Sequence, residues 1–487
     1  MLFYELQFII PFVFILLLYT QLQRKGQNYL ILFAGYLFYG MWDWRFLSLL
    51  LITTALDYSA GYLIDHCRPH SRKRKLYLAL SMTVNLGVLS YYKYMNFFVE
   101  SLAQLLNAPI PANSFVANVI LPAGISFYTF QSMSYVIDVY RGHIRAEKNF
   151  IDFAAFVSYF PHLVAGPIQR ADVLLAQITR DRELTLAGFF LGCRLFLFGL
   201  FKKLVVGDNV AKLVDPVFSN PQSFDAITLL VAAYAFSIQI YCDFSGYTDM
   251  ARGVSKMMGI NLTLNFNYPY FATSIRDFWK RWHISLSTWF RDYLYIPLGG
   301  NRHSEPRAIF NLFVTFLLSG LWHGAGWTYI LWGAYHGMLV AIEHYCAKRW
   351  IGRWAQNMPL LLKIFITFHL VVFGWILFRA ASLPQFSVYL KGLFTWNTDW
   401  IERLIQSKTW FDVLGVVGPL VLGTMTIKFL IYYLPLLGLD MLECRAKGEL
   451  WEKSQGKIIQ GAFYGLLLFL IFTFGVSNAK QFIYFQF

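Results

Sequence analysis

The stretch "MLFYELQFIIPFVFILLLYTQLQRKGQ" (residues 1–27) decides the class of fold. Its apolar run from Phe3 to Leu22 matches the roughly 20 residues that a helix needs to cross the hydrocarbon core of a bilayer. No basic residue precedes this run and no small-residue cleavage site follows it. We therefore interpret it as a first membrane span and not as a removed signal peptide.

Similar apolar stretches recur along the chain. They are Phe46–Ile64, Leu76–Phe98, Ala308–Leu318, Trp327–Ile342, Leu360–Phe378, Phe411–Tyr433 and Ile458–Val476. Only 14% of the 487 residues are charged and 57% are hydrophobic, whereas soluble proteins carry about a quarter charged residues. The sequence therefore predicts an all-α polytopic integral membrane protein with about eleven spans. We expect one domain over residues 1–487, with re-entrant or interfacial helices beyond about residue 150.

The basic residues of the first half alternate between loops. Three loops carry two, five and three Lys or Arg residues, and the two intervening loops carry one between them. The basic loops are Thr20–Gln27, Asp65–Lys75 and Arg141–Asn149, and the intervening ones are Trp42–Arg45 and Val99–Phe115. This asymmetry predicts a cytoplasmic location for the basic loops and an N-terminus outside. It also accounts for the net charge of +14 without a nucleic-acid partner.

The longest break in hydrophobicity is the polar and aromatic stretch Ser255–His303. From Phe278 to Tyr293, aromatic side chains recur on one side of a helical wheel and cationic or hydroxyl side chains on the other. This pattern predicts a single amphipathic helix in the membrane interface, ended by "IPLGGN" (Ile296–Asn301). His283 lies near the boundary between the two faces, where it could face a cavity.

The stretch "SGLWHGAGW" (Ser319–Trp327) places His323 inside apolar sequence. An ionisable group within a span is costly and is a candidate for a substrate path or a proton transfer, and imidazole is a suitable base near neutral pH. The flanking glycines let either a neighbouring helix or a substrate approach closely. Position alone leaves helix packing and function equally supported.

Other polar residues receive structural interpretations. His66 and His70 could share a helix face, as in membrane di-iron enzymes, but no further ligand pair follows and we expect no metal. The five cysteines form no C-x-x-C pair, so neither a disulfide framework nor a zinc site is expected.

Asp249 can pair with Arg252, whereas Asp243 has no local partner. We expect hydrogen bonds between helices for the remaining buried histidines, which are His162, His336 and His369.

Five stretches together resemble the membrane-bound O-acyltransferase family, and more closely its bacterial alginate O-acetyltransferase branch. They are "YFPHLVAGPIQR" (Tyr159–Arg170), "QIYCDFSGYTDMARG" (Gln239–Gly253), "DFWKRWHISLSTWFRDYLYIPLGGNR" (Asp277–Arg302), "SGLWHGAGWTYILWGAYHG" (Ser319–Gly337) and "FIYFQF" (Phe482–Phe487). The resemblance implies a helical fold of about eleven spans around a central tunnel, and two facing catalytic histidines, His323 and His283. It also implies acetyl-CoA as donor substrate, with no permanently bound cofactor.

The implied activity is transfer of acetyl from cytoplasmic acetyl-CoA across the inner membrane to an extracytoplasmic polysaccharide, with alginate the first candidate. A separate periplasmic or surface esterase-type acetyltransferase with Ser, Asp and His would pass the group onward. Expected phosphate contacts are Arg276, Lys280, Arg281, Arg291 and Arg302, and expected tunnel residues are Asp243 and Trp322. Alternatives are D-alanyl transfer to a cell-wall polymer, transport of a polysaccharide precursor, and a di-iron hydroxylase.

Overall fold

The computed structural model describes residues 3–107, 119–347, 349–395, 424–445 and 456–476. Every regular element in these ranges is a helix, which confirms the all-α prediction. Residues 411–423 of the predicted span Phe411–Tyr433 and the ending at 482–487 lie outside the described residues.

The chain packs as two compact units. Unit 1 comprises Met1–Phe196, Tyr247–Asn265 and His283–Tyr293. Unit 2 comprises Leu197–Gly246, Phe266–Trp282 and Leu294–Phe487. The prediction of one functional domain over residues 1–487 stays a prediction.

Unit 1 is built from short and long helices, where η denotes a 3-10 or π turn. They are α1 (Leu6–Gln21), α2 (Arg24–Asp43), η1 (Trp44–Phe46), α3 (Leu47–His66), α4 (Arg72–Leu89), η2 (Ser90–Tyr94), α5 (Met95–Leu106), α6 (Ile125–Arg141), α7 (Phe150–Val157), η3 (Ala171–Leu175), α8 (Ala176–Ile178), α13 (Ile284–Phe290) and most of η7 (Arg291–Tyr295). Two helices, α9 (Leu186–Leu200) and α11 (Ala226–Met257), contribute residues to both units.

Unit 2 holds the later helices. They are η4 (Phe201–Gly207), α10 (Asp208–Ser219), η5 (Pro221–Ser223), η6 (Pro269–Phe271), α12 (Ile275–Arg281), α14 (Glu305–His323), α15 (Trp327–Cys346), α16 (Trp350–Asn357), α17 (Leu360–Arg379), α18 (Leu383–Phe394), α21 (Thr424–Arg445) and α22 (Lys457–Phe474).

Four helical stretches of the described chain are long and apolar enough to cross a membrane. They are Arg24–His66, Ala226–Met257, Leu360–Arg379 and Lys457–Phe474. Two of them contain predicted apolar stretches, and Lys457–Phe474 overlaps the predicted stretch Ile458–Val476. The fourth, α11, was not among those stretches. The remaining predicted spans fall in α1, in α4 with η2 and the start of α5, in α14, in α15, and in α21 for its described part. The fold is thus a helical membrane protein, and the count of about eleven spans stays a prediction.

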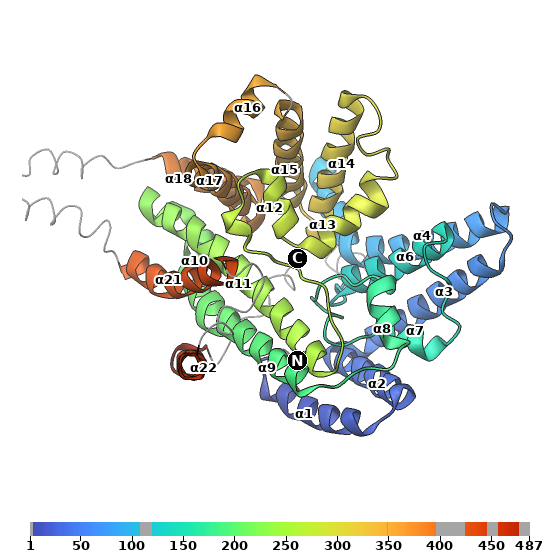
Figure 1. The fold of residues 1–487 in the computed structure, drawn as a ribbon. Coiled ribbons are helices and arrows are strands. Elements are labelled where there is room, and N and C mark those ends of the chain that lie inside the picture. The colour runs from blue at the N-terminus through green and yellow to red at the C-terminus, as the bar shows by residue number, and fades with distance from the viewer. Residues whose placement is uncertain (1–2, 108–118, 348, 396–423, 446–455, 477–487) are drawn as a thin grey trace, which may run out of the picture. The chain divides into compact units, whose positions relative to one another are not determined.

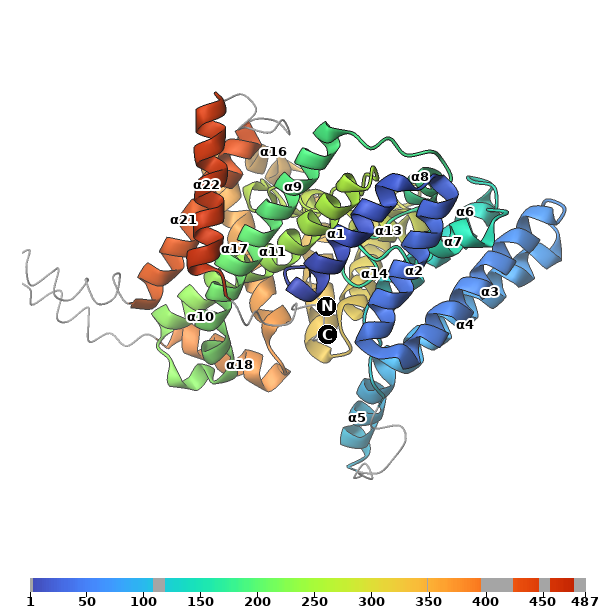
Figure 2. The same ribbon diagram turned by 90° about the horizontal axis from the view of Figure 1, so that it is seen from below.

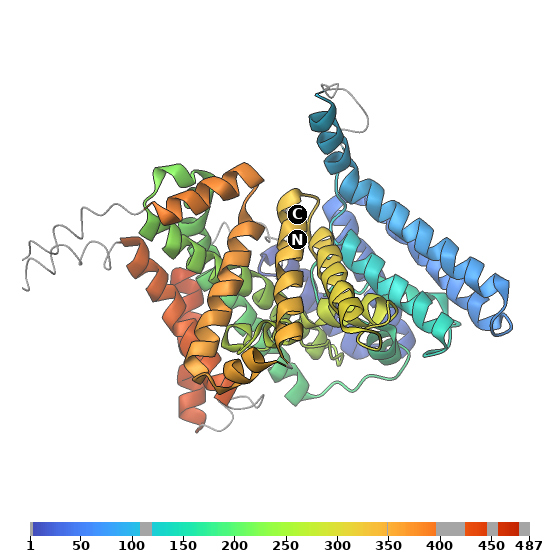
Figure 3. The same ribbon diagram turned by 90° about the horizontal axis from the view of Figure 1, so that it is seen from above.

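Within unit 1, helices α3, α4 and α6 pack against one another (Figures 2 and 3). Asp57 of α3 is completely buried and accepts hydrogen bonds from Ser81 Oγ at 2.6 Å and Asn85 Nδ2 at 2.8 Å, both on α4. Gly61 lets α3 approach α6 closely, because a Cβ at this position would lie 2.6 Å from the ring of Tyr135. Small residues and interhelical hydrogen bonds are the usual means of packing helices in a bilayer, where lipid is as apolar as leucine.

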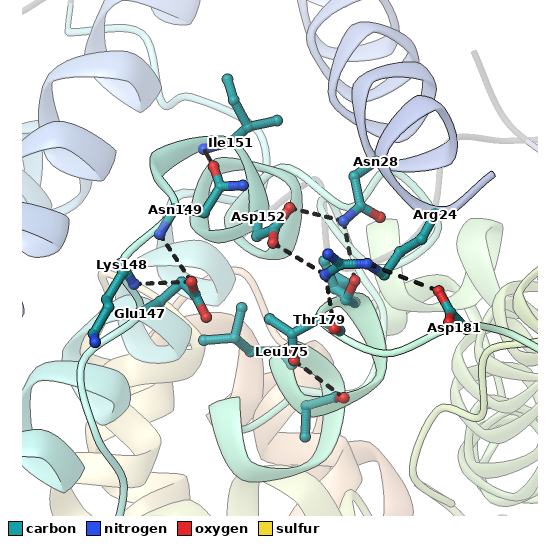
Figure 4. A network of polar contacts seen from close by, with 12 residues as sticks. Arg24, Asn28, Glu147, Lys148, Asn149, Ile151, Asp152, Leu175, Thr179 and Asp181 are labelled. Atoms are coloured by element: carbon teal, nitrogen blue, oxygen red, sulfur yellow. Dashed lines mark hydrogen bonds and ion pairs between the residues drawn. The ribbon is translucent and has the colours of Figure 1, made fainter. Parts of the chain in front are cut away.

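A second polar network joins α2 to α7 and α8 (Figure 4). Asn28 Nδ2 donates to Asp152 Oδ1 at 2.8 Å and to the Ile178 carbonyl at 3.0 Å. Arg24 Nη1 donates to the Thr179 carbonyl at 2.7 Å and lies 3.6 Å from the Asp152 carboxylate. Side chains of α2 thereby satisfy the carbonyl groups at the end of α8. These contacts attach the first turns of α2 to α7 and α8.

In unit 2, helices α14 and α15 form an antiparallel hairpin and α17 packs beside α15 (Figure 1). The hairpin turns at Gly324–Gly326, and both of these glycines have extended backbones. A Cβ on Gly320 would lie 2.3 Å from the Tyr329 carbonyl oxygen and 2.8 Å from the Gly333 Cα. The two backbones therefore meet where neither helix carries a side chain.

The aromatic stretch departs from its prediction. Instead of one interfacial helix, the chain forms α12 and α13, with Trp282 and His283 between them, and then the π turn η7. Trp282, Leu286 and Trp289 are all buried by protein. The expected single helix is therefore wrong, because it breaks at His283. Its expected location in the membrane interface stays a prediction. The expected end of helical structure before "IPLGGN" is confirmed, since η7 stops at Tyr295.

Candidate functional site

His283 occupies the break between α12 and α13 in a left-handed backbone conformation with φ of 44°. This conformation is uncommon for a residue with a Cβ and persists only where surrounding contacts impose it. The side chain is completely buried, and its ring stacks on Phe127 of α6 with 6.5 Å between centroids. Burial lowers the pKa of His283 to about 3, so the ring is neutral near pH 7.

Asn265 organises the backbone and side chains around His283. Its side-chain oxygen Oδ1 accepts hydrogen bonds from Ser285 N at 3.2 Å and Ser285 Oγ at 2.9 Å, and lies 3.2 Å from His283 Nδ1. Its backbone carbonyl accepts from Ile284 N at 3.0 Å. Asn265 thus satisfies two of the N–H groups that the first turn of α13 leaves without helical partners. Ser285 Oγ in turn accepts a hydrogen bond from Ile168 N at 3.0 Å.

His323 is the last residue of α14 and is 3% exposed. Aromatic rings surround it in unit 2: Trp322, Trp332 and Phe378 lie with centroids 5.1, 5.0 and 5.6 Å from the imidazole. Trp332 belongs to α15 and Phe378 to α17. We call His323, Trp322, Trp332 and Phe378 the His323 aromatic enclosure. Such an enclosure excludes water and strengthens any electrostatic interaction made inside it.

The glycines beside His323 are used for packing. A Cβ on Gly324 would lie 2.3 Å from the Tyr329 ring, and Gly320 meets Gly333 as described above. The helix-packing interpretation of these two glycines is therefore confirmed. Room for a substrate arm beside His323 must come from elsewhere, because protein atoms already fill the space at both positions.

Three of the five cations predicted to bind phosphate are paired with carboxylates. Arg276 Nε lies 2.9 Å from Glu343 Oε1, Arg281 Nε lies 2.9 Å from Asp277 Oδ1, and Arg291 Nε lies 2.7 Å from Asp292 Oδ1. Lys280 and Arg302 are exposed, and neither has an ion pair within the described residues. The charges open to an anionic ligand are therefore those of Lys280 and Arg302.

Asp243 has a partner that its sequence neighbourhood does not reveal. Lys203 of η4 forms ion pairs with Asp243 of α11 and, at 3.0 Å, with Asp208 at the start of α10. All three side chains are at most 5% exposed. The predicted tunnel residue Asp243 is thus part of a buried ion triad, whereas the predicted tunnel residue Trp322 contacts His323. The other expected pair is confirmed, since Arg252 Nη1 lies 3.3 Å from Asp249 Oδ1.

The other histidines divide into two groups. His369 Nε2 bonds the Tyr234 hydroxyl at 2.8 Å, which confirms the expected hydrogen bond between helices. His162 Nε2 also bonds, to Gln131 Oε1 at 2.6 Å, but from a turn to α6. The same expectation is wrong for His336, whose two ring nitrogens have no hydrogen-bond partner among the described residues. Trp279 and Trp332 pack against its ring instead.

The structure offers no metal site within the described residues, where no group of three or more His, Cys, Asp or Glu side chains is close enough to hold an ion. His66 ends α3, whereas His70 lies beyond it with φ of 60°. The expectation that these two rings share a helix face is therefore wrong, because the helix stops between them.

Comparison with known proteins decides the family. The model of the MBOAT, membrane-bound O-acyltransferase family matches residues 139–382. A probable alginate O-acetylase, AlgI, of Pseudomonas aeruginosa is 44% identical over 415 residues, covering 85% of this chain and 78% of its own. The chain belongs to the membrane-bound O-acyltransferase family. This family membership makes the protein an acyltransferase and confirms the resemblance found in the sequence.

Two further relatives of this acyltransferase differ in the acceptor that their names give. The peptidoglycan O-acetyltransferase of Helicobacter pylori is 33% identical and covers 97% of this chain and 94% of its own. The teichoic acid D-alanyltransferase of Bacillus subtilis is 30% identical but covers only 58% of this chain and 74% of its own. The O-acetyl relatives therefore match more of this acyltransferase than the D-alanyl relative does.

The sequence singled out His283 and His323 as candidates, but not the residues that surround His283. Asn265 and Ser285 are ordinary polar residues in the aromatic stretch, and no spacing rule links a residue to a partner 18 or 20 positions away. His283 belongs to unit 1 and His323 to unit 2. Their predicted arrangement face to face stays a prediction.

Proposed function

We propose that this acyltransferase is the membrane subunit of an O-acetylation system. It takes acetyl from cytoplasmic acetyl-CoA and passes it across the membrane for transfer to an extracytoplasmic polysaccharide. The observation that carries the proposal is His323, a buried imidazole at a helix end within an aromatic enclosure, in a chain that belongs to an acyltransferase family.

The proposed chemistry centres on the thioester carbonyl. The His323 ring acts as general base on an incoming hydroxyl, or carries the acetyl group briefly on a ring nitrogen. The aromatic enclosure supports acyl transfer over hydrolysis, because it keeps water from an acyl group held inside it. His283 either stabilises the oxyanion of the tetrahedral intermediate or takes part in proton transfer.

The phosphates of acetyl-CoA would be attracted first by Lys280 and Arg302, which no carboxylate neutralises within the described chain. Arg276, Arg281 and Arg291 would have to give up part of an existing ion pair to bind a phosphate. We therefore rank these three arginines below Lys280 and Arg302 as donor contacts.

An alginate-type polysaccharide is the proposed final acceptor, on the identity with the alginate O-acetylase relative. Peptidoglycan is the second candidate, because the relative of that name matches nearly the full length of both chains. A separate periplasmic or surface acetyltransferase of the Ser/Asp/His esterase type would complete the transfer. The proposed location is a bacterial cytoplasmic membrane, with the N-terminus outside.

The test replaces His323 with Ala in the purified protein, reconstituted in lipid nanodiscs with acetyl-CoA. We expect CoA release to fall by about 10²–10⁴-fold, since this is the usual contribution of a general base. His336→Asn is the matched control, because His336 is also buried and contacts the same Trp332 ring. It should retain CoA release within about threefold, as expected for loss of packing alone.

Polymer acetylation in cells completes this test. Normal acetylation by His323→Ala, in protein inserted at the level of the unmodified chain, would overturn the assignment of His323. A transporter of polysaccharide precursors would release no CoA from acetyl-CoA in either protein. A D-alanyl transferase would release no CoA either, but would accept a D-alanyl thioester.

A further inference from the structure

We propose that Asn265 is a positioning residue that holds His283 as the neutral tautomer with its proton on Nδ1, which makes Nε2 a hydrogen-bond and proton acceptor. The inference rests on the proposed function and deepens it. It chooses between the two roles left to His283, because a neutral ring with a lone pair on Nε2 cannot donate a hydrogen bond from Nε2 to an oxyanion.

The first step is the orientation of the Asn265 amide. An amide oxygen and nitrogen are distinguished by the hydrogen bonds around them. The backbone N–H of Ser285 is always a donor, and it points at one of these two atoms from 3.2 Å. That atom must be the oxygen. The Ser285 hydroxyl, which accepts from Ile168 N, directs its own proton to the same oxygen at 2.9 Å.

The second step is the proton on His283. Its Nδ1 lies 3.2 Å from this oxygen, which only accepts. A lone pair on Nδ1 would face the lone pairs of the amide oxygen, whereas a proton on Nδ1 makes a hydrogen bond. The neutral imidazole carries one proton, so Nε2 holds the lone pair. Burial lowers the pKa of His283 to about 3 and so keeps the second proton away near pH 7.

The third step is that the arrangement is rigid. The left-handed backbone of His283, the Asn265 carbonyl bonded to Ile284 N, and the stacking on Phe127 all restrict the ring. Asn265 is itself 1% exposed, and its Nδ2 has no hydrogen-bond partner among the described residues. A buried amide with an unsatisfied donor is costly. The hydrogen bonds that its oxygen accepts, at the first turn of α13 and at His283, explain why it is present.

The chemical consequence concerns the proton of the attacking group. When the His323 ring attacks the thioester, its unprotonated nitrogen forms a bond to the carbonyl carbon, and the other ring nitrogen releases its proton. The sulfur gains a proton as the carbon–sulfur bond breaks, so no proton is gained or lost overall. The tautomer therefore gives His283 Nε2 the role of proton acceptor in the proposed chemistry, and not that of a donor to the oxyanion.

The direct test is ¹⁵N NMR of the full chain in nanodiscs with labelled histidine. The His283 signals are those absent from the spectrum of His283→Gln. We expect a protonated Nδ1 and an unprotonated Nε2 in the unmodified protein, and loss of this preference in Asn265→Leu. A proton on Nε2 in the unmodified protein would refute the proposal. Because this measurement needs no turnover, it stands even if acetyl-CoA proves to be the wrong donor.

Kinetics provide the second test. Asn265→Leu should lower kcat for CoA release by about 10²-fold or more with little change in KM, as for other losses of a tautomer-fixing partner. Asn265→Asp keeps an acceptor for Nδ1–H and should restore kcat within about threefold. Its carboxylate stabilises the imidazolium, so the acid limb of the pH–rate profile should move to higher pH.

Thr263→Val is the matched control for the kinetic test. It removes the hydrogen bond from Gln169 Nε2 to Thr263 Oγ1 (3.0 Å), two residues from Asn265, without touching His283. If loosening this segment were the cause, Thr263→Val would lower kcat as much as Asn265→Leu does, and Asn265→Asp would give no rescue. An unchanged kcat in Asn265→Leu would also count against the proposal.

Discussion

Lys203 carries its charge in the interior of unit 2, where the carboxylates of Asp208 and Asp243 surround its ammonium group. Taking three charges out of water is expensive, and such a group is stable only as a complete set. Lys203 therefore contributes to stability mainly because it neutralises the two buried carboxylates, and not because the ion pairs themselves are strongly favourable. It also joins three elements, because η4, α10 and α11 each supply one member.

At this same scale we predict the effect of Lys203→Met. The variant removes the ammonium group that lies between two buried carboxylates and should lower the free energy of unfolding by about 3–5 kcal/mol. Thermal unfolding in detergent measures the loss. Arg252→Met, at the more exposed pair with Asp249, should cost less than about 1 kcal/mol. The triple variant with Asp208→Asn and Asp243→Asn should recover much of the loss, and equal destabilisation by the single and triple variants would contradict this account.

At the scale of elements, the α14–α15 hairpin is defined by backbone contact. Gly320 and Gly333 meet, and Gly337 faces the Phe313 carbonyl of the opposite helix at 3.1 Å from an added Cβ. A spacing of four residues places Gly333 and Gly337 on one face of α15. That face sets how close the two helices lie, and hence where the end of α14 holds His323.

Gly320→Ala should therefore separate the two helices. The added Cβ would overlap the Tyr329 carbonyl and the Gly333 Cα, and we expect a loss of about 1–3 kcal/mol in the free energy of unfolding. Gly465→Ala in α22 is the control, because nothing lies within 4 Å of an added Cβ there; it should be neutral or stabilising by up to about 1 kcal/mol. Equal unfolding temperatures for the two variants would show that the close approach of α14 and α15 does not contribute to the free energy of unfolding.

The elements also show what the sequence could predict. The apolar stretches predicted α3, α15 and α17 correctly, since composition alone decides whether a helix suits a bilayer. The aromatic stretch has helical periodicity on both sides of His283, yet its helix breaks there. Asn265 accepts hydrogen bonds from the first N–H groups of α13, 19 and 20 residues away, and local periodicity contains no information on such a contact. His323 was found because an ionisable group in apolar sequence is conspicuous without any structure.

At the scale of the whole molecule, the loops of the first half predict an orientation. The segment Asp65–Lys75, from the end of α3 into the first turn of α4, holds five Lys or Arg residues, whereas the turn between α2 and α3 holds Arg45 alone. Both loops are exposed to solvent, so each can be reached by a reagent. The cytoplasm retains basic loops during insertion.

Cysteine labelling tests this orientation. After replacement of the five native cysteines, Pro69→Cys should react with a membrane-impermeant maleimide only when spheroplasts are broken. Arg45→Cys should react in intact spheroplasts, since the positive-inside rule places its loop outside. Labelling of Pro69→Cys in intact spheroplasts would reverse the predicted topology. If both cysteines react only after the spheroplasts are broken, the two loops lie on the same, cytoplasmic side of the membrane.

Phe378 of α17 forms one side of the His323 aromatic enclosure, and it is synthesised after the other residues of that enclosure. The hairpin of α14 and α15 leaves the ribosome first, and α17 follows only after residue 360. At about 5–20 residues per second, the nascent chain holds an imidazole that is open on one side for seconds before the ring arrives. His323 thus lacks one side of its enclosure during early synthesis, and the enclosure is complete only after α17 has been made.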